Sequence, residues 1–233
     1  MSSSAPVASA NDRELATIEL LGALAYGQLR AFEATARTVP HAPTTKLADE
    51  LASFAVGEHE RYIRLRDELA RRTELPVAVM DRQRHRFDDY FDHAPLTDWF
   101  GASMFFAIGL PMASDFGRAI APVLPADLAK LVVETLDRGA AEALAAQQAR
   151  AILTDEAARQ RARHLLADML GRALTGFQAV MDDTDALMVL LDADRRPGES
   201  GEQRVKRLAI TVLEGHRRRT VALGLEDLDD DED

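Results

Sequence analysis

Apolar side chains recur every three or four residues over most of the chain, and this spacing constrains the fold more than any other feature of the sequence. Ile18, Leu21, Ala25 and Phe32 show the pattern near the N-terminus. The period matches the 3.6 residues of an α-helical turn. No segment of any length alternates apolar and polar residues as a half-buried strand would. The sequence therefore predicts an all-α protein.

Proline and glycine divide this pattern into separate helices. We expect Asp12 to cap a first helix that ends before the prolines of residues 38–45. The later helices are expected over residues 46–72, near 81–91 within the connection 73–98, over 98–121 with a bend at Pro111, over 126–153, over 155–191 with a break near Gly176 or Asp183, and over 202–223. The expected organisation is a disordered segment 1–11, a helical bundle 12–192, a linker with a C-terminal helix 193–225, and an acidic tail 226–233.

The lengths of the connections indicate how these helices pack. Short links join the first helix to the second and the third to the fourth, so each pair is expected to form an antiparallel hairpin. The connection 73–98 is long enough to cross the bundle between the two hairpins. Two hairpins joined by one long crossover form a ferritin-like four-helix bundle. The remaining long helix and the C-terminal helix are expected as additions to this bundle.

Composition excludes several classes of function. The formal net charge of −11 argues against nonspecific nucleic-acid binding and against docking to anionic membranes. The chain has no cysteine, so disulfides, thiolate metal sites and cysteine nucleophiles are excluded. The N-terminal residues do not form a signal-peptide pattern, and no apolar run approaches the length of a membrane span. We therefore expect a cytoplasmic protein.

Polar residues on the apolar stripes predict a polar site in the bundle core. Gln28 and Glu58 fall on the buried stripes of the first two helices at similar distances from their turn. Leu110 and Arg138 lie at matching distances from the turn of the second hairpin. A di-iron or di-manganese site in such a bundle takes one carboxylate from each of two helices and a Glu-x-x-His from each of the other two. These four positions provide one carboxylate, that of Glu58.

A buried carboxylate must be neutral, ion-paired or bound to a metal. The first interpretation is that Glu58 pairs with Arg61 or Arg138. The others are a functional polar pocket around Glu58, or a metal site there. Two arginines beside one carboxylate would repel a divalent cation, which disfavours the metal site.

Three segments resemble a known family: Leu20–Leu29 (LLGALAYGQL), Leu65–Leu69 (LRDEL) and Thr97–Trp99 (TDW). They are similar to an actinobacterial family of ferritin-like proteins related to the bacterial tRNA hydroxylase, with the resemblance covering about residues 14–192. It implies a glutamate at the position of Gln28, histidines at Arg61 and Ala141, an acidic residue at Leu110 and a glutamate at Arg138. Glu58 alone keeps the family's ligand. The resemblance therefore implies the fold, and these replacements argue against the family's oxygen chemistry.

From the same comparison we hypothesise that an arginine stands where positive iron once balanced the carboxylates. Changing Arg138 to Ala should then destabilise the bundle more than a surface change does.

Other polar clusters have ordinary explanations. His85, Asp89 and His93 have a spacing that could hold a metal on a continuous helix, but Pro95 follows them and solvated loop charges explain them as well. Arg82, Arg84 and Arg86, with aromatic neighbours, and the basic run 216–219 could contact RNA, which the net charge disfavours. Phe100, Phe105, Phe106 and Phe116 are expected in the core, where they could line an apolar cavity.

Three functions remain open. The leading hypothesis is a non-catalytic protein that acts by binding a protein partner or by forming a homo-oligomer, with no cofactor. The second is a metal-dependent oxidase or hydroxylase that holds iron or manganese in a shifted register through Glu58, Glu33, Asp115 or Glu142. The third is a binder of a small apolar ligand in the bundle core.

Overall fold

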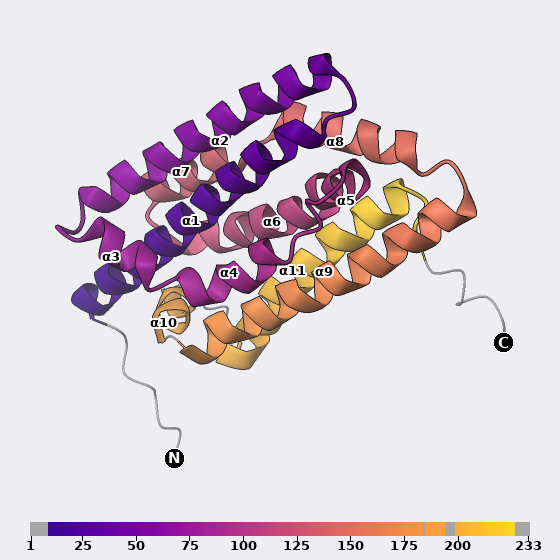
Figure 1. Cartoon of the computed structure of the whole chain (residues 1–233). Helices are drawn as coiled ribbons and strands as arrows, with labels where there is room; N and C mark the ends of the chain where they lie inside the picture. Colours follow the sequence, from indigo (N-terminus) through magenta and orange to yellow (C-terminus); the bar gives the residue numbers. More distant parts are fainter. Residues whose placement is uncertain (1–8, 184, 194–198, 227–233) are drawn as a thin grey trace, which may run out of the picture.

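The first two helices form an antiparallel hairpin. In the computed structural model, which describes residues 9–183, 185–193 and 199–226, α1 (Ala10–Thr38) packs along α2 (Thr45–Ala70) (Figure 1). The 3-10 turn η1 (Val39–His41), which contains Pro40, joins them. The hairpin expected from the proline-containing turn is therefore present.

Ser9, and not Asp12, caps α1. The Asp12 N–H donates to the Ser9 hydroxyl at 3.2 Å, and the Ser9 N–H donates to the Asp12 carboxylate at 3.0 Å. This reciprocal pair is a capping box, in which Asp12 is the third helical residue. The helix thus begins inside the segment 1–11 that was expected to be disordered, of which residues 1–8 lie outside the described residues.

The crossover between the hairpins contains two short helices where the sequence predicted one. They are α3 (Pro76–Asp81) and α4 (Arg84–Asp92). α3 packs on α1, and α4 packs between α1 and α9. Pro76 begins α3, since the first turn of a helix needs no N–H at that position.

The second hairpin is less regular than predicted. Its first arm consists of α5 (Trp99–Met104), the π-helical turn η2 (Phe105–Gly109) and α6 (Leu110–Ile120), so the irregularity expected from Pro111 lies just before that residue. Pro111 has no N–H to donate to the preceding turn, which accounts for the change in winding. After η3 (Ala121–Val123), the second arm is interrupted between α7 (Ala126–Leu136) and α8 (Gly139–Ile152). The prediction of one continuous helix over 126–153 is therefore wrong.

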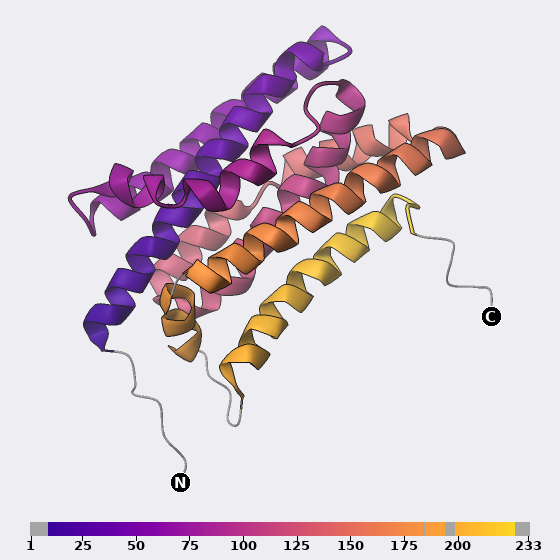
Figure 2. The same ribbon diagram turned by 60° about the horizontal axis from the view of Figure 1, so that its bottom comes forward.

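Three further helices cover this core. α9 (Glu156–Asp183) passes through Gly176 unbroken, and α10 (Asp185–Ala193) begins two residues after it ends, close to the break expected at Asp183. α11 (Gly201–Ala222) packs along α6, and α9 and α11 run side by side on one face of the bundle (Figures 1 and 2). The C-terminal helix, expected as an extension, is thus part of the helical body. Residues 194–198, which include most of the expected linker, and residues 227–233 of the acidic tail expected over 226–233 lie outside the described residues.

Two groups of buried apolar side chains form the core. One includes Leu21, Leu65 and Val132, and the other includes Phe105 and Leu166. The part of the chain that the structure describes contains no strand, which confirms the all-α, ferritin-like class. In the same residues no helix combines the length and the apolar character that a membrane crossing needs.

Candidate functional site: a buried polar cluster beside an apolar cavity

Four buried polar side chains meet inside the bundle. They are Gln28 of α1, Glu58 of α2, Ser114 of α6 and Arg138 of the break between α7 and α8, and their exposed fractions are 2%, 2%, 0% and 5%. We call these four residues the polar cluster. Each arm of the two hairpins therefore contributes one polar side chain to the same part of the core: α1, α2 and α6 from within a helix, and the last arm from the break between α7 and α8.

The Arg138 guanidinium lies at the centre of the polar cluster. Its Nε donates to Glu58 Oε1 at 2.8 Å, and its Nη2 donates to Glu58 Oε2 at 3.2 Å. Nη2 also donates to Gln28 Oε1 at 3.0 Å, and Nη1 donates to the Ser114 hydroxyl. The Gln28 amide donates to Glu58 Oε2. Each buried polar side chain of the cluster thus has a partner, which burial requires.

The interruption of the second hairpin places Arg138 in the core. Asp137 has extended backbone, with φ −77° and ψ 114°, and its carboxylate accepts the Gly139 N–H at 3.1 Å. This local hydrogen bond stabilises a non-helical conformation, as aspartate side chains do at helix starts. Two arginines bind carbonyls left free at the end of α7: Arg61 Nη2 donates to Asp137 O at 2.9 Å, and Arg118 Nη2 donates to Leu136 O at 2.6 Å.

Arg61 also borders the polar cluster. Its Nη1 lies 3.5 Å from Glu58 Oε1, at the limit of a hydrogen bond, and 24% of its side chain is exposed. Glu58 therefore pairs with both arginines that the sequence offered, and Arg138 is the closer and more buried of the two.

The residues at the predicted ligand positions do not fit a metal. Both Glu58 oxygens accept hydrogen bonds from Arg138, so a permanent cation occupies the face of the carboxylate that a metal would need. Leu110 and Ala141 have no donor atom; both line a second cavity, of about 40 Å³, beside Glu58 and Arg138. Iron and manganese need several oxygen or nitrogen donors, and this set offers only the Glu58 carboxylate and the Gln28 amide, which already bond to Arg138 and to each other.

The carboxylates proposed for a shifted register are occupied elsewhere. Glu33 pairs with Arg30 at 3.0 Å. Asp115 pairs with Arg219 at 2.6 Å, and Glu142 lies 3.3 Å from Arg118. No group of three or more potential metal-ligating side chains occurs among the described residues. The geometry therefore gives the shifted site no support.

The histidine and arginine groups of the crossover are also bound to neighbours. The Asp89 carboxylate pairs with His93 at 3.1 Å and with Arg172 at 3.1 Å, and His93 lies just beyond α4 instead of extending one helical face. Arg82 pairs with Glu19, and Arg84 lies 3.4 Å from Asp88. These ion pairs neutralise two of the three arginines considered for RNA binding. Within the basic run 216–219, Arg219 pairs with Asp115 of α6.

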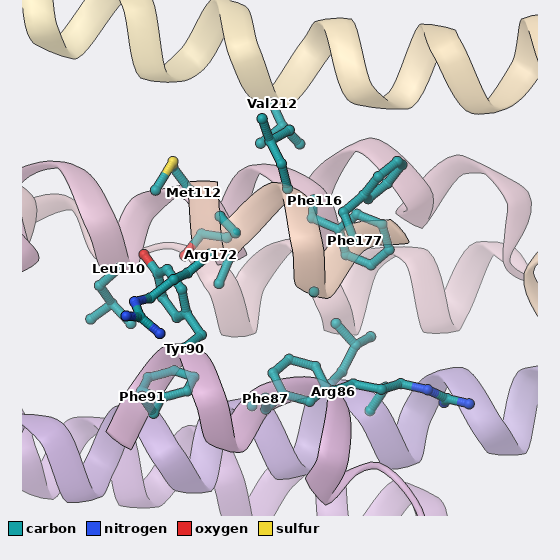
Figure 3. Close-up of a pocket in the computed structure, with 18 of the residues that line it drawn as sticks. Arg86, Phe87, Tyr90, Phe91, Leu110, Met112, Phe116, Arg172, Phe177 and Val212 are labelled. Carbon is teal, nitrogen blue, oxygen red and sulfur yellow. The ribbon is translucent and has the colours of Figure 1, made fainter. Parts of the chain in front are cut away.

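An apolar cavity of about 140 Å³ lies between α1, α4, α6, α9 and α11. Figure 3 shows Phe87 and Tyr90 rising from α4 towards Met112 and Phe116, with Val212 reaching down from α11. Leu174 also lines the cavity and is 40% exposed, so the cavity reaches the surface beside α9. The lining residues are Leu20, Ala23, Leu24, Gly27, Gln28, Arg86, Phe87, Tyr90, Phe91, Leu110, Met112, Ala113, Ser114, Phe116, Leu136, Arg138, Leu170, Arg172, Ala173, Leu174, Gly176, Phe177, Ala209 and Val212.

Of the four phenylalanines predicted to line a cavity, Phe116 lines this one. Phe105 is fully buried elsewhere in the core, Phe106 lines the 40 Å³ cavity, and Phe100 packs under Arg161. Sequence reasoning missed Phe91, Phe177 and the role of Phe87 and Tyr90. The aromatic spacing within residues 87–91 was visible, but only the packing of α4 and α9 against the bundle shows that these rings share one space.

Two kinds of polar group stand out in the cavity lining, the hydroxyl of Tyr90 and the guanidinium groups of three arginines. The Tyr90 hydroxyl is buried and has no hydrogen-bond partner among the described residues. Burial raises the pKa of Tyr90, and the charge of Arg219 opposes that rise, so the phenol stays protonated at neutral pH. Three arginines, Arg86, Arg138 and Arg172, also line the cavity.

Sequence comparison agrees with this architecture. A family model described as a ferritin-like domain of actinomycetes matches residues 12–194. Among curated proteins, none matches the chain. The matched residues run from the first turn of α1 to the end of α10, which includes the polar cluster and all of the cavity wall except that from α11. The chain therefore belongs to the ferritin-like domain family of actinomycetes.

Proposed function

We propose that the protein is a non-catalytic ferritin-like protein that binds a small, largely apolar ligand in the cavity between α1, α4, α6, α9 and α11. The observation that supports this most is the cavity itself, about 140 Å³ of space with an apolar and aromatic lining. An apolar cavity of about 150 Å³ engineered into another protein stays dry and binds benzene or xenon. The ligand expected here is therefore about the size of one substituted aromatic ring.

The polar cluster supports the non-catalytic part of the proposal. In this view the chain shares ancestry with the tRNA-hydroxylase-like proteins and has lost their metal ligands. Arg138 supplies the positive charge that balances Glu58, through hydrogen bonds of 2.8 and 3.2 Å. No cofactor is needed to keep this core folded, because the buried carboxylate already has its counter-charge.

Association with a protein partner, or with a second copy, remains a prediction. Large exposed apolar side chains occur on several elements, singly at Leu15, Val56 and Val133, and as the close pairs Leu75 with Val77 and Ile210 with Leu213. Scattered apolar residues of this kind are normal on a protein surface and do not mark an interface. The cavity is the more specific feature, and we therefore place ligand binding first.

Calorimetric titration and thermal unfolding with toluene and indole would test the proposal. The wild-type protein should bind one equivalent and unfold at a higher temperature, because a ligand that binds only the native state stabilises it. An Ala173→Phe variant should lose both effects, since Ala173 lines the cavity and a phenyl ring would fill it.

The matched control is Ala167→Phe, on the exposed side of the same helix. It adds the same ring outside the cavity and should bind as the wild type does. Absence of binding by the wild type, or undiminished binding by Ala173→Phe, would contradict the proposal.

A further inference from the structure

We propose that the ligand is a small carboxylic acid, with an apolar body in the cavity and its carboxylate against Arg86. This inference rests on the proposed ligand-binding function and adds the chemical class of the ligand. Three observations carry it: the sign of the charges that line the cavity, the lack of a carboxylate partner for one of them, and the hydroxyl of Tyr90.

The charged side chains that line the cavity all have one sign. Arg86, Arg138 and Arg172 line it, and no aspartate or glutamate occurs in the described lining. The whole chain has a formal charge of −11, so a cavity whose charged lining residues are all cations departs from the average of the molecule. In a mostly apolar space such charges favour an anion, because water screens the attraction less there than in bulk solvent.

Two of the three arginines already have carboxylate partners. Arg138 pairs with Glu58 at 2.8 Å. Arg172 pairs with Asp89 and with Asp168, each at 3.1 Å. A ligand that bound either guanidinium would compete with an existing ion pair.

Arg86 has no carboxylate within ion-pair distance in the part of the chain that the structure describes. Its Nη1 donates to the amide oxygen of buried Gln83, and its Nε is buried and has no hydrogen-bond partner among the residues that the structure describes. The Gln83 amide donates in turn to Glu19 at 2.7 Å, and that carboxylate also pairs with Arg82. Arg86 is thus oriented by a neutral side chain while its positive charge remains uncompensated, and an arginine matches a carboxylate with two parallel hydrogen bonds.

Tyr90 provides a second donor on the same helix. Its hydroxyl is the other buried polar atom of the lining on α4 without a partner among the described residues. Arg86 and Tyr90 lie one helical turn apart, and Figure 3 shows their polar ends on opposite sides of Phe87. A Cβ at Gly109 would lie 2.9 Å from Tyr90 Oη, so the absence of a side chain there leaves room for this hydroxyl beside η2.

This arrangement favours an acid with an oxygen at the end opposite its carboxylate. The carboxylate would accept from Arg86, the ring would pack on Phe87 and Phe116, and the second oxygen would accept from Tyr90. Both unpaired groups are hydrogen-bond donors, and a buried donor without an acceptor is costly, so a ligand that supplies acceptors gains affinity at both ends.

Calorimetric titration with benzoate, its neutral isostere benzamide, 4-hydroxybenzoate and toluene tests the inference at neutral pH. Wild-type protein should bind benzoate about tenfold or more tightly than benzamide, as expected for a charge-assisted hydrogen bond. It should bind 4-hydroxybenzoate more tightly than benzoate. Arg86→Met should abolish the preference for benzoate over benzamide, and Arg86→Lys should retain part of it. Tyr90→Phe should abolish the gain from the 4-hydroxyl group.

Toluene binding distinguishes the two proposals. If Arg86→Met binds toluene as the wild type does, the cavity of the variant is intact and its loss of benzoate binding is specific. The control Arg84→Met removes a cation from the same helix that does not line the cavity, and it should leave every affinity unchanged. Equal affinity of the wild type for benzoate and benzamide, with toluene bound, would refute the carboxylate inference alone. Failure of all four compounds to bind would refute the proposed function as well.

Discussion

Replacing Arg138 by methionine removes the guanidinium at the centre of the polar cluster and keeps most of the side-chain volume. Glu58, 2% exposed, then loses the hydrogen bonds at 2.8 and 3.2 Å. Removing one partner of a buried ion pair costs about 3–5 kcal/mol, because the other charge stays buried and unpaired. Arg61, 3.5 Å from the same carboxylate and partly exposed, can compensate in part. We therefore expect the free energy of unfolding to fall by an amount near the lower end of this range, about 3 kcal/mol.

Chemical denaturation followed by circular dichroism at 222 nm measures this loss. A destabilisation of that size lowers the melting temperature of a protein of this length by roughly 10 °C. Arg64→Met is the matched control, since Arg64 pairs with Glu134 at 3.0 Å while both side chains are 47% exposed. Exposed pairs contribute about 0–1 kcal/mol. A loss for Arg138→Met no larger than that of the control would refute the reasoning.

The origin of the loss can be tested separately from its size. If the unpaired charge of Glu58 causes it, Glu58→Gln introduced into Arg138→Met should restore much of the lost stability, because the second change removes that charge. The Gln28 amide could still donate to the new side chain. A double variant less stable than Arg138→Met would show that packing or the helix break, and not the unpaired charge, dominates.

Two further predictions concern backbone space and pH. Gly101→Ala should destabilise by about 1–3 kcal/mol, because its Cβ would lie 2.1 Å from the Pro95 carbonyl oxygen. Gly171→Ala, in the same test of denaturation, should stabilise by about 0.5–1 kcal/mol, because a Cβ there would have no neighbour within 4 Å among the described residues beyond its own helical backbone, and alanine favours the helix. Burial, and then the charge of Arg219, lowers the pKa of His216 below its ordinary 6.5, so the unfolded chain binds a proton more readily than the native one. Stability should therefore fall as the pH drops below about 6.5, and His216→Gln should reduce that slope; an unchanged slope would contradict the assigned burial.

The helical class and the facing of Gln28, Glu58 and Arg138 could be predicted because they depend on local periodicity and on distances counted from two proline-containing turns. Each residue of a helix advances the chain by about 1.5 Å, so equal counts from a turn place two residues at one level. The ion pair of Glu58 could be predicted as well, because a buried carboxylate needs a counter-charge and Arg61 and Arg138 were expected at the same level of the bundle. Counting from a turn fixes the level of a residue only within its own hairpin, and bringing Arg138 to Glu58 also depends on the two hairpins packing as in a ferritin-like bundle.

The break at Arg138 and the cavity could not be predicted in the same way. Residues 126–153 contain no proline after Pro125, and Gly139 alone does not end a helix; the break depends on the Asp137 carboxylate and on Arg61 and Arg118 from other helices. The cavity is a space between helices distant in the sequence. Its walls depend on where α9 and α11 pack. An apolar stripe indicates that a helix packs against something, but it does not identify the neighbouring helix.

The polar cluster and the proposed ligand site are connected through Arg138. Gln28, Ser114 and Arg138 face the cavity, yet their hydrogen bonds are directed at one another and at Glu58. A ligand would gain little from this wall, because each new hydrogen bond would replace an existing one. Within the described cavity lining, the buried donors that remain unpaired are on α4, at Arg86 and Tyr90. In our proposal the loss of the metal ligands and the gain of a binding site are therefore linked. Because Arg138 already pairs with Glu58, the polar recognition of a new ligand is left to Arg86 and Tyr90 of α4, on the opposite wall of the cavity.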